Sequence, residues 1–139
     1  MSSAYFDGRP DQVSRIRDWS RSATGLDHDS ADPVMLVVSE LVTNAVRHSA
    51  SGSRYGRVRV TVEVLPGQVV LVSVTDDGPR PGRTTSLPRL PVHADELREG
   101  GHGLRLVNEL SERWWWTGGA GGPLTVWSLI DPQRDLHRV

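Results

Sequence analysis

Three residues, Glu40, Asn44 and His48, have the side-chain types and the spacing that could do chemistry. They recur every four positions inside a stretch whose apolar residues predict a helix, and at about 100° per residue they step only ~40° around it. A carboxylate, an amide and an imidazole on one stripe could hold a hydrated magnesium ion and position a hydroxyl group or water molecule. Taken alone, the motif is better explained as an ordinary polar stripe with weak contacts.

A second motif, Asp76-Asp77-Gly78-Pro79, follows a stretch that is apolar enough to be a buried strand. Asp, Gly and Pro all favour turns, so a plain turn is the simpler interpretation of this motif alone. In the functional interpretation, one carboxylate faces inward and accepts a hydrogen bond from an exocyclic amine such as that of adenine.

A third motif, Gly101-His102-Gly103, precedes a predicted helix that begins Leu104-Arg105. Glycines let a phosphate approach the backbone, and the free amides at a helix start bind anions. The motif is not a dinucleotide fingerprint, because no strand directly precedes it and Leu106 stands where a third glycine belongs. Arg105 could add a charge-assisted contact or be a solvated surface residue.

Together the three motifs fit the parts of a nucleoside triphosphate: its metal and phosphates, its base, and its phosphate tail. All sixteen Lys and Arg residues are arginine. The absence of lysine excludes the phosphate-binding P-loop and the strand lysine of protein kinases. Phosphate chemistry in this chain must therefore use arginine, backbone amides or a metal.

The elements that would position these motifs follow from apolar periodicity and turn residues. Ser30 or Asp32 is expected to cap the long second helix, with Pro33 in its first turn. Residues 80–99 contain several prolines and predict a loop, and residues 131–139 predict a frayed tail. The expected helices span Asp11 to Ala23, Asp29 to Ser49 and Gly103 to Glu112, and the expected strands Arg57 to Leu65, Gln68 to Thr75, Arg113 to Thr117 and Leu124 to Ile130.

These elements predict an α+β fold, a two-layer α/β sandwich. Hairpins give a mostly antiparallel sheet, and the helices gather on one of its faces. The length of 139 residues suits a single domain over residues 1–139. We expect Trp114, Trp115, Trp116 and Trp127 to serve core and cross-strand packing, and His28, His93 and His137 to be surface residues.

Composition narrows the function classes. A formal net charge of −1 gives no electrostatic case for direct nucleic-acid binding. No apolar run approaches the ~20 residues of a membrane span, and the start of the chain lacks the pattern of a signal peptide. Cysteine is absent, which excludes disulfides and thiolate metal sites. A cytoplasmic protein is expected.

The order and spacing of the motifs resemble the histidine-kinase-like ATPase superfamily, the GHKL or Bergerat ATP-binding fold. The likeness runs from about Asp11 to Ile130 and is nearest to the small bacterial anti-sigma-factor serine/threonine kinases. Its most specific part is Ser39-Glu40-Leu41-Val42-Thr43-Asn44-Ala45-Val46-Arg47-His48, which matches the N box of that branch. Asp76-x-Gly78, Gly101-x-Gly103-Leu104-x-Leu106-Val107 and Thr125-Val126-Trp127 match later segments.

The resemblance implies ATP and Mg²⁺ as ligands, with Glu40 as general base and Asn44 as metal ligand. It implies that Asp76 binds the adenine amine, that Thr125 lies close to the base, and that residues 80–100 form an ATP lid. The nucleotide would also contact Arg47, His48, Gly78, Gly101, His102, Gly103, Leu104 and Arg105. Three features depart from the family pattern: Arg80 replaces the second glycine of Asp-x-Gly-x-Gly, Pro123-Leu124 stands where relatives often have glycine and lysine, and the lid is short and proline-rich.

Two functions are compatible with the resemblance. In the first, the chain transfers the γ-phosphate of ATP to a serine or threonine of a partner protein, an anti-sigma-factor antagonist, and can sequester a sigma factor. In the second, it is a non-catalytic module whose partner binding is gated by ATP. The resemblance is compatible with a homodimer. A histidine autokinase is disfavoured, because the chain has no room for a separate helix pair carrying the phosphoacceptor histidine.

Overall fold

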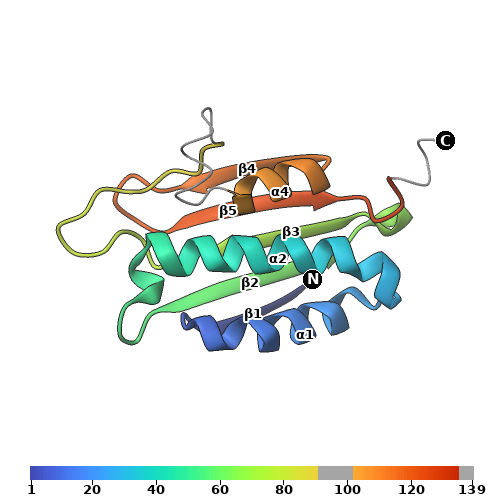
Figure 1. Cartoon of the computed structure of the whole chain (residues 1–139), viewed down its shortest axis with the longest axis horizontal. Helices are drawn as coiled ribbons and strands as arrows, with labels where there is room; N and C mark the ends of the chain where they lie inside the picture. The colour runs from blue at the N-terminus through green and yellow to red at the C-terminus, as the bar shows by residue number, and fades with distance from the viewer. Residues whose placement is uncertain (91–101, 135–139) are drawn as a thin grey trace.

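The computed structural model describes residues 1–90 and 102–134, which form one antiparallel sheet with helices on one face (Figure 1). The strand order is β1-β2-β3-β5-β4. This arrangement confirms the predicted α+β sandwich. Its strands are β1 (Ser2–Asp7), β2 (Arg57–Val64), β3 (Val70–Thr75), β4 (Arg113–Gly118) and β5 (Leu124–Ile130), and its α-helices are α1 (Val13–Thr24), α2 (His28–His48) and α4 (His102–Leu110).

Strand β1 is absent from the sequence-based expectation, which begins with a helix. It pairs antiparallel with β2 from Ser2 opposite Val62 to Asp7 opposite Arg57. Only Ala4 and Phe6 are partly buried in this edge strand, so its apolar alternation is too short to predict a strand. The other elements occur in the predicted order, with ends that differ by no more than two residues.

The start of α2 differs from the predicted cap. The N-cap is Asp27, whose carboxylate accepts a hydrogen bond of 2.8 Å from the backbone N–H of Ser30. Ser30 therefore supplies the capped amide instead of the cap, and Asp32 lies inside the helix. Pro33 falls beyond the first turn, so its predicted position is also wrong. Aspartate is as good a cap as serine, and periodicity could not choose between neighbouring polar residues.

Helix α2 lies across the middle of the sheet between α1 and α4 (Figure 1), and its apolar stripe forms one wall of the core. Alternate residues of the two central strands form the other wall, as their period of two predicts. The fully buried residues of the two walls include Val34, Val37, Val38 and Val42 from α2, and Val58, Val60, Val70 and Val72 from β2 and β3. Glu40 and Asn44 therefore lie on a helix that is held along its length by packing against the sheet.

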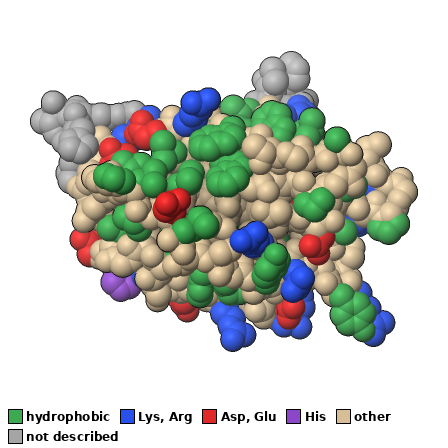
Figure 2. Space-filling model, turned by 180° about the vertical axis from the view of Figure 1, so that it is seen from behind, with side chains coloured by type: hydrophobic (Ala, Val, Ile, Leu, Met, Phe, Trp, Pro, Cys, Tyr) green, Lys and Arg blue, Asp and Glu red, His purple; other side chains and the backbone are tan. Residues whose placement is uncertain are grey.

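No described helix covers the other face of the sheet, because α1, α2 and α4 all lie on the side that faces the viewer in Figure 1; Figure 2 shows the molecule from the uncovered side. Trp115 and Trp127, paired across β4 and β5, stack there with ring centroids 6.1 Å apart. Trp114 packs against the core instead, whereas Trp116 is 42% exposed. The expected cross-strand packing is therefore confirmed for one tryptophan pair. Among the described residues, no helix is long and apolar enough to cross a membrane.

Candidate functional site

Glu40 and Asn44 lie one turn apart on α2 and are both half-buried. The Glu40 carboxylate rests against the first turn of α4, because a Cβ added to Gly103 would collide with Glu40 Oε2. Gly103 is therefore required for this close approach. The contact joins the first and third sequence motifs, which are separated by more than sixty positions in the chain.

The start of α4 is held in place by its own apolar residues. Leu104 and Val107 are buried against the core, which fixes the helix beside α2. Backbone amides at a helix start lack intrahelical acceptors and favour anions. His102 is the first residue of α4, and Gly101 lies outside the described residues. The arrangement places a carboxylate and an anion-binding helix end next to each other.

Asp76 follows β3 and is half-buried. Its Oδ1 accepts hydrogen bonds from the backbone N–H of Gly78 (2.7 Å) and of Leu124 (3.1 Å). Burial raises the pKa of this carboxyl above its ordinary value, and these two hydrogen bonds oppose the rise. Within the described part of the chain, Oδ2 has no hydrogen-bond partner. One oxygen is therefore committed to the backbone, and the other can accept a hydrogen bond from a ligand.

The turn that carries Asp76 is tied to the end of α2 by contacts that the sequence did not reveal. Asp77 Oδ2 accepts a hydrogen bond of 2.7 Å from the backbone N–H of Arg57, and the Asp77 N–H donates to Ser51 Oγ at 2.9 Å. The N–H of Ala50 donates to the Gly78 carbonyl at 2.8 Å. Ser51 is fully buried, and no local pattern marks it, since its partner is 26 positions away.

Arg47 and His48 lie at the C-terminal end of α2 and are exposed. Partial burial lowers the pKa of His48, and the positive charges of Arg47 and Arg80 lower it further. His48 is therefore favoured in its neutral form. Neither side chain has a hydrogen bond or ion pair with the rest of the described chain.

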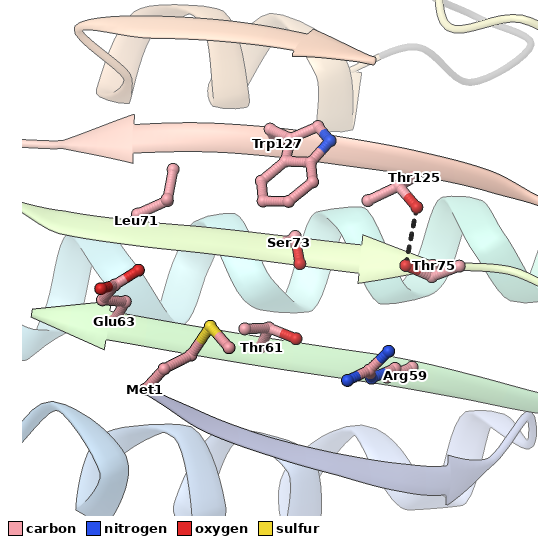
Figure 3. A pocket seen from close by; sticks show the side chains of 9 residues that line it. All are labelled: Met1, Arg59, Thr61, Glu63, Leu71, Ser73, Thr75, Thr125 and Trp127. Atoms are coloured by element: carbon pink, nitrogen blue, oxygen red, sulfur yellow. Dashed lines mark hydrogen bonds between the residues drawn. The ribbon is translucent and has the colours of Figure 1, made fainter. Parts of the chain in front are cut away.

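Within the described residues, the side chains of Arg105 and Thr125 bond to residues outside the candidate set. The exposed Arg105 guanidinium pairs with Glu109 on its own helix at 3.6 Å. The Thr125 hydroxyl is 2.8 Å from that of Thr75, and both line a hollow on the uncovered face of the sheet (Figure 3). Figure 3 shows the helices behind the strands, so the Thr125 hydroxyl lies on the opposite side of the sheet from α2.

This hollow is a shallow space of about 300 Å³ between strands β2, β3 and β5. Trp127 forms one wall, the small side chains of Thr61 and Ser73 form the floor, and Arg59 and Glu63 stand at opposite ends (Figure 3). It is separate from the Asp76 and Glu40 carboxylates. None of the sequence motifs predicts it.

The expected lid, residues 80–100, is described only as far as Leu90. Within this part, Thr85 Oγ1 accepts a hydrogen bond of 2.8 Å from the backbone N–H of Gly121, in the glycine-rich turn between β4 and β5. A Cβ on Gly119 would lie 3.4 Å from Thr85 Cγ2. The first half of the segment therefore runs along this turn.

The donor set is compatible with magnesium held jointly by protein and ligand. The described residues contain no cluster of three or more His, Cys, Asp or Glu that could hold a metal ion. Glu40 and Asn44 do supply hard oxygen donors on one stripe. Mg²⁺ commonly binds through one or two such side chains and completes its shell with water and substrate phosphates.

Comparison with known proteins shows which family has this sequence pattern. Residues 6–126 match the family model described as a histidine kinase-like ATPase domain. The serine-protein kinase RsbW of Staphylococcus aureus is 32% identical over 97 residues, covering 66% of this chain and 60% of that protein. Blue-light-activated histidine kinase 2 of Erythrobacter litoralis is 32% identical over 98 residues, covering 70% of this chain and 24% of that protein.

Among solved structures, the histidine kinase domain from the blue-light-activated histidine kinase EL346 of Erythrobacter litoralis aligns with a TM-score of 0.49 and 25% identity. The alignment covers 87% of this chain and 63% of that one. The chain thus spans only 24% and 60% of the lengths of the two sequence relatives. The family match covers the helices that carry the candidate site and most of the sheet, and the chain belongs to the histidine kinase-like ATPase domain family.

Proposed function

We propose that the chain binds Mg-ATP between α2, the start of α4 and the Asp76 turn, and transfers the γ-phosphate to a serine or threonine of a partner protein. The observation that carries the proposal is the Glu40 carboxylate packed against Gly103 at the start of α4. A general base must lie beside the site of the reacting phosphate, and a helix start is a favourable place for that phosphate.

The proposed orientation of the nucleotide uses the two carboxylates differently. Asp76 accepts a hydrogen bond from the adenine amine through Oδ2, because Oδ1 is already bonded to the backbone. Asn44 binds the magnesium ion, and the amides at the start of α4 receive the phosphates. Arg47, His48 and Arg105 are solvent-exposed, and in the proposal they contact the phosphate oxygens from the outside of the site. Thr125 is left out, since its hydroxyl lies on the other face of the sheet.

In the transfer step, Glu40 accepts the proton of the partner's hydroxyl group while the hydroxyl oxygen forms a bond to the γ-phosphorus. The bond from that phosphorus to the β,γ-bridging oxygen breaks, and ADP leaves with the electron pair. Magnesium neutralises charge on the phosphate oxygens when bound. Most of the catalysis in such reactions comes from positioning and electrostatic stabilisation.

The identity of the partner is proposed by analogy. The relative RsbW is a serine-protein kinase, and it supports a protein substrate. In the proposal the substrate is an anti-sigma-factor antagonist, the chain also sequesters a sigma factor, and it regulates transcription in the cytoplasm.

The second candidate function is a non-catalytic module that binds its partner only with ATP in place. One observation favours it. Arg80 replaces a family glycine at the root of the lid and is bonded to the end of α2, at Val46 and Arg47. A lid fixed at its root suits long nucleotide retention better than rapid turnover.

Self-association is a further part of the proposal, through the uncovered face of the sheet. Arg59 and Glu63 lie four residues apart on the same face of β2. A twofold axis near Thr61 would therefore set each Arg59 against the Glu63 of a second copy, as an isologous interface requires. We expect Arg59→Glu and Glu63→Arg each to weaken dimerisation in sedimentation velocity, and the double variant to recover it; a monomeric parent would refute this part.

The transfer reaction is tested with a thiophosphate ATP analogue and desalted lysate, comparing the parent with Glu40→Gln. We expect a protein labelled by the parent and labelled 10²–10⁴-fold more slowly by the variant, the usual effect of losing a general base. Glu40→Gln keeps the size of the side chain, so equilibrium binding of ATP should be nearly unchanged. Asn44→Ala tests the proposed metal ligand: its binding of ATP should no longer depend on magnesium.

Equal labelling by the parent and Glu40→Gln would contradict the catalytic role. Absence of any labelled protein, from a parent chain that binds ATP, would favour the ATP-gated module. Absence of ATP binding by the folded parent would refute both.

A further inference from the structure

The C-terminal end of α2 lacks the usual glycine cap. The residue that follows the helix, Ser49, is extended, with φ −140°. The last carbonyls of a helix have no intrahelical partners and need other donors. The Ser49 hydroxyl donates to the carbonyl of Ala45 at 2.7 Å, and the Arg80 guanidinium donates to those of Arg47 (Nη1, 3.2 Å) and Val46 (Nη2, 3.3 Å).

Arg80 is well suited to this position. Its planar fork can reach two neighbouring carbonyls, and its positive charge is favourable at the negative end of the helix dipole. Gly52 leaves room for it, since a Cβ there would lie 3.2 Å from Arg80 Nη2. The chain just before Arg80 is itself fixed by the 2.8 Å hydrogen bond from Ala50 N–H to the Gly78 carbonyl.

We propose that Arg80 is a positioning residue that fastens the root of the lid segment to the end of the helix carrying Glu40 and Asn44, and thereby slows the release of nucleotide. The inference rests on the proposed function and concerns residues 80–90 alone.

A second contact also holds this segment in place. Thr85 is bonded to Gly121, so the described part of the segment is held near its root and near its middle. Only five positions separate these anchors. Breaking the Arg80 anchor should therefore free the stretch between the two anchors, around the exposed Arg83.

Arg134 provides a matched control. Its guanidinium donates to the carbonyls of Glu109 (3.2 Å) and Ser111 (3.1 Å) at the end of α4 and pairs with Glu112 at 3.3 Å. It is thus a second arginine that caps a helix end, but it does not contact residues 80–90. Loss of either arginine should lower thermal stability, whereas only loss of Arg80 should affect the lid segment.

The test compares the parent with Arg80→Ala, Arg80→Lys and Arg134→Ala. The first measurement is the dissociation rate of a fluorescent ATP analogue chased with unlabelled ATP. The second is the rate of trypsin cleavage after Arg83 without nucleotide; residue 80 precedes Pro81, so the Arg80 variants neither remove nor add a tryptic site. We expect Arg80→Ala to raise both rates several-fold to about tenfold, the range for losing exposed charge-assisted hydrogen bonds. Arg80→Lys should be intermediate, and Arg134→Ala should match the parent.

The outcomes separate this inference from the proposed function. If Arg80→Ala lowers only the melting temperature and leaves both rates at the parental values, Arg80 is a helix cap alone and the inference is overturned. If the folded parent binds no nucleotide, the proposed function fails and so does the retention by Arg80, while the cleavage rates still decide whether Arg80 anchors the segment.

Discussion

The two sides of the candidate site are built in opposite ways. At the Asp76 side, one carboxylate oxygen accepts two backbone hydrogen bonds, and Asp77 and Ser51 join the turn to β2 and to the end of α2. At the Glu40 side, neither Glu40 nor Asn44 has a hydrogen bond or ion pair with the rest of the described chain. The Glu40 carboxylate is placed there by packing against Gly103.

This difference indicates how the two sides would serve a nucleotide. A base amine offers one hydrogen bond of fixed direction, and a fixed acceptor binds it with little loss of conformational entropy. Phosphates and magnesium bring their own charge and hydration, so donors without protein partners can reorganise around them. The Asp76 side, which is preformed, would set specificity for the base. The Glu40 side, whose donors have no protein partners, would reorganise when the ligand binds.

The largest expected effect comes from removing the Asp76 carboxylate. Asp76→Ala leaves the amides of Gly78 and Leu124 without an acceptor, in residues that are themselves buried. An unpaired buried amide costs about 1–3 kcal/mol, so the free energy of unfolding should fall by about 2–4 kcal/mol in urea titrations. ATP affinity, measured by calorimetry, should fall at least tenfold.

Asp76→Asn separates these two losses. It keeps an oxygen for the backbone amides, so its stability should be close to that of the parent while its affinity for ATP still falls. A variant that binds ATP like the parent would show that Asp76 belongs only to the turn. Because burial raises the pKa of Asp76, affinity should weaken with falling pH at a pH above that expected for an ordinary aspartate.

Gly103→Ala tests the packing on the other side, with an intermediate effect. Alanine normally stabilises a helix interior by about 0.5–1 kcal/mol relative to glycine. In the parent, the added Cβ forces the flexible end of the Glu40 side chain to move, so we expect this gain to be largely cancelled. In the Glu40→Ala background the collision is gone, and the same change should stabilise.

The measurement is a double-mutant cycle of urea unfolding with four proteins. A clearly larger stabilisation by Gly103→Ala in the Glu40→Ala background than in the parent supports the placement of Glu40 at the start of α4. The same stability change in both backgrounds would mean that the carboxylate does not rest on Gly103.

The smallest expected effect concerns His48, at the end of α2 where the two sides are joined. Burial and the charges of Arg47 and Arg80 lower its pKa in the folded chain, so the unfolded chain binds more protons. Stability should therefore fall as pH drops from above the ordinary value near 6.5 through the folded pKa. NMR titration should show a low pKa for His48 that rises in Arg80→Ala, with His48→Gln used for assignment.

A His48 pKa that does not respond to Arg80→Ala would place the Arg80 charge away from the end of α2. It would argue against the contact that joins the lid root to this helix.

Local patterns predicted the parts of the fold that local physics controls. The period of two in β2 and the apolar stripe of α2 each follow from burying one face, and the structure confirms them. Strand β1 was missed because it is an edge strand with few buried residues. The capping role of Asp27 was missed because Ser30 and Asp32 are equally suitable caps, and the exact start of the helix decides among them.

The sequence by itself determined the α+β sandwich, the helix stripe that carries Glu40 and Asn44, and the acidic turn after a buried strand. These depend on residue type and on spacing within one element. Only the tertiary structure decided that Glu40 meets Gly103, that Ser51 holds the Asp77 amide, and that Arg80 caps α2. It also put the Thr125 hydroxyl on the uncovered face, because the strand pairing fixes which way each side chain points. Each of these contacts joins residues far apart in the chain, and their geometry is set by how the layers pack.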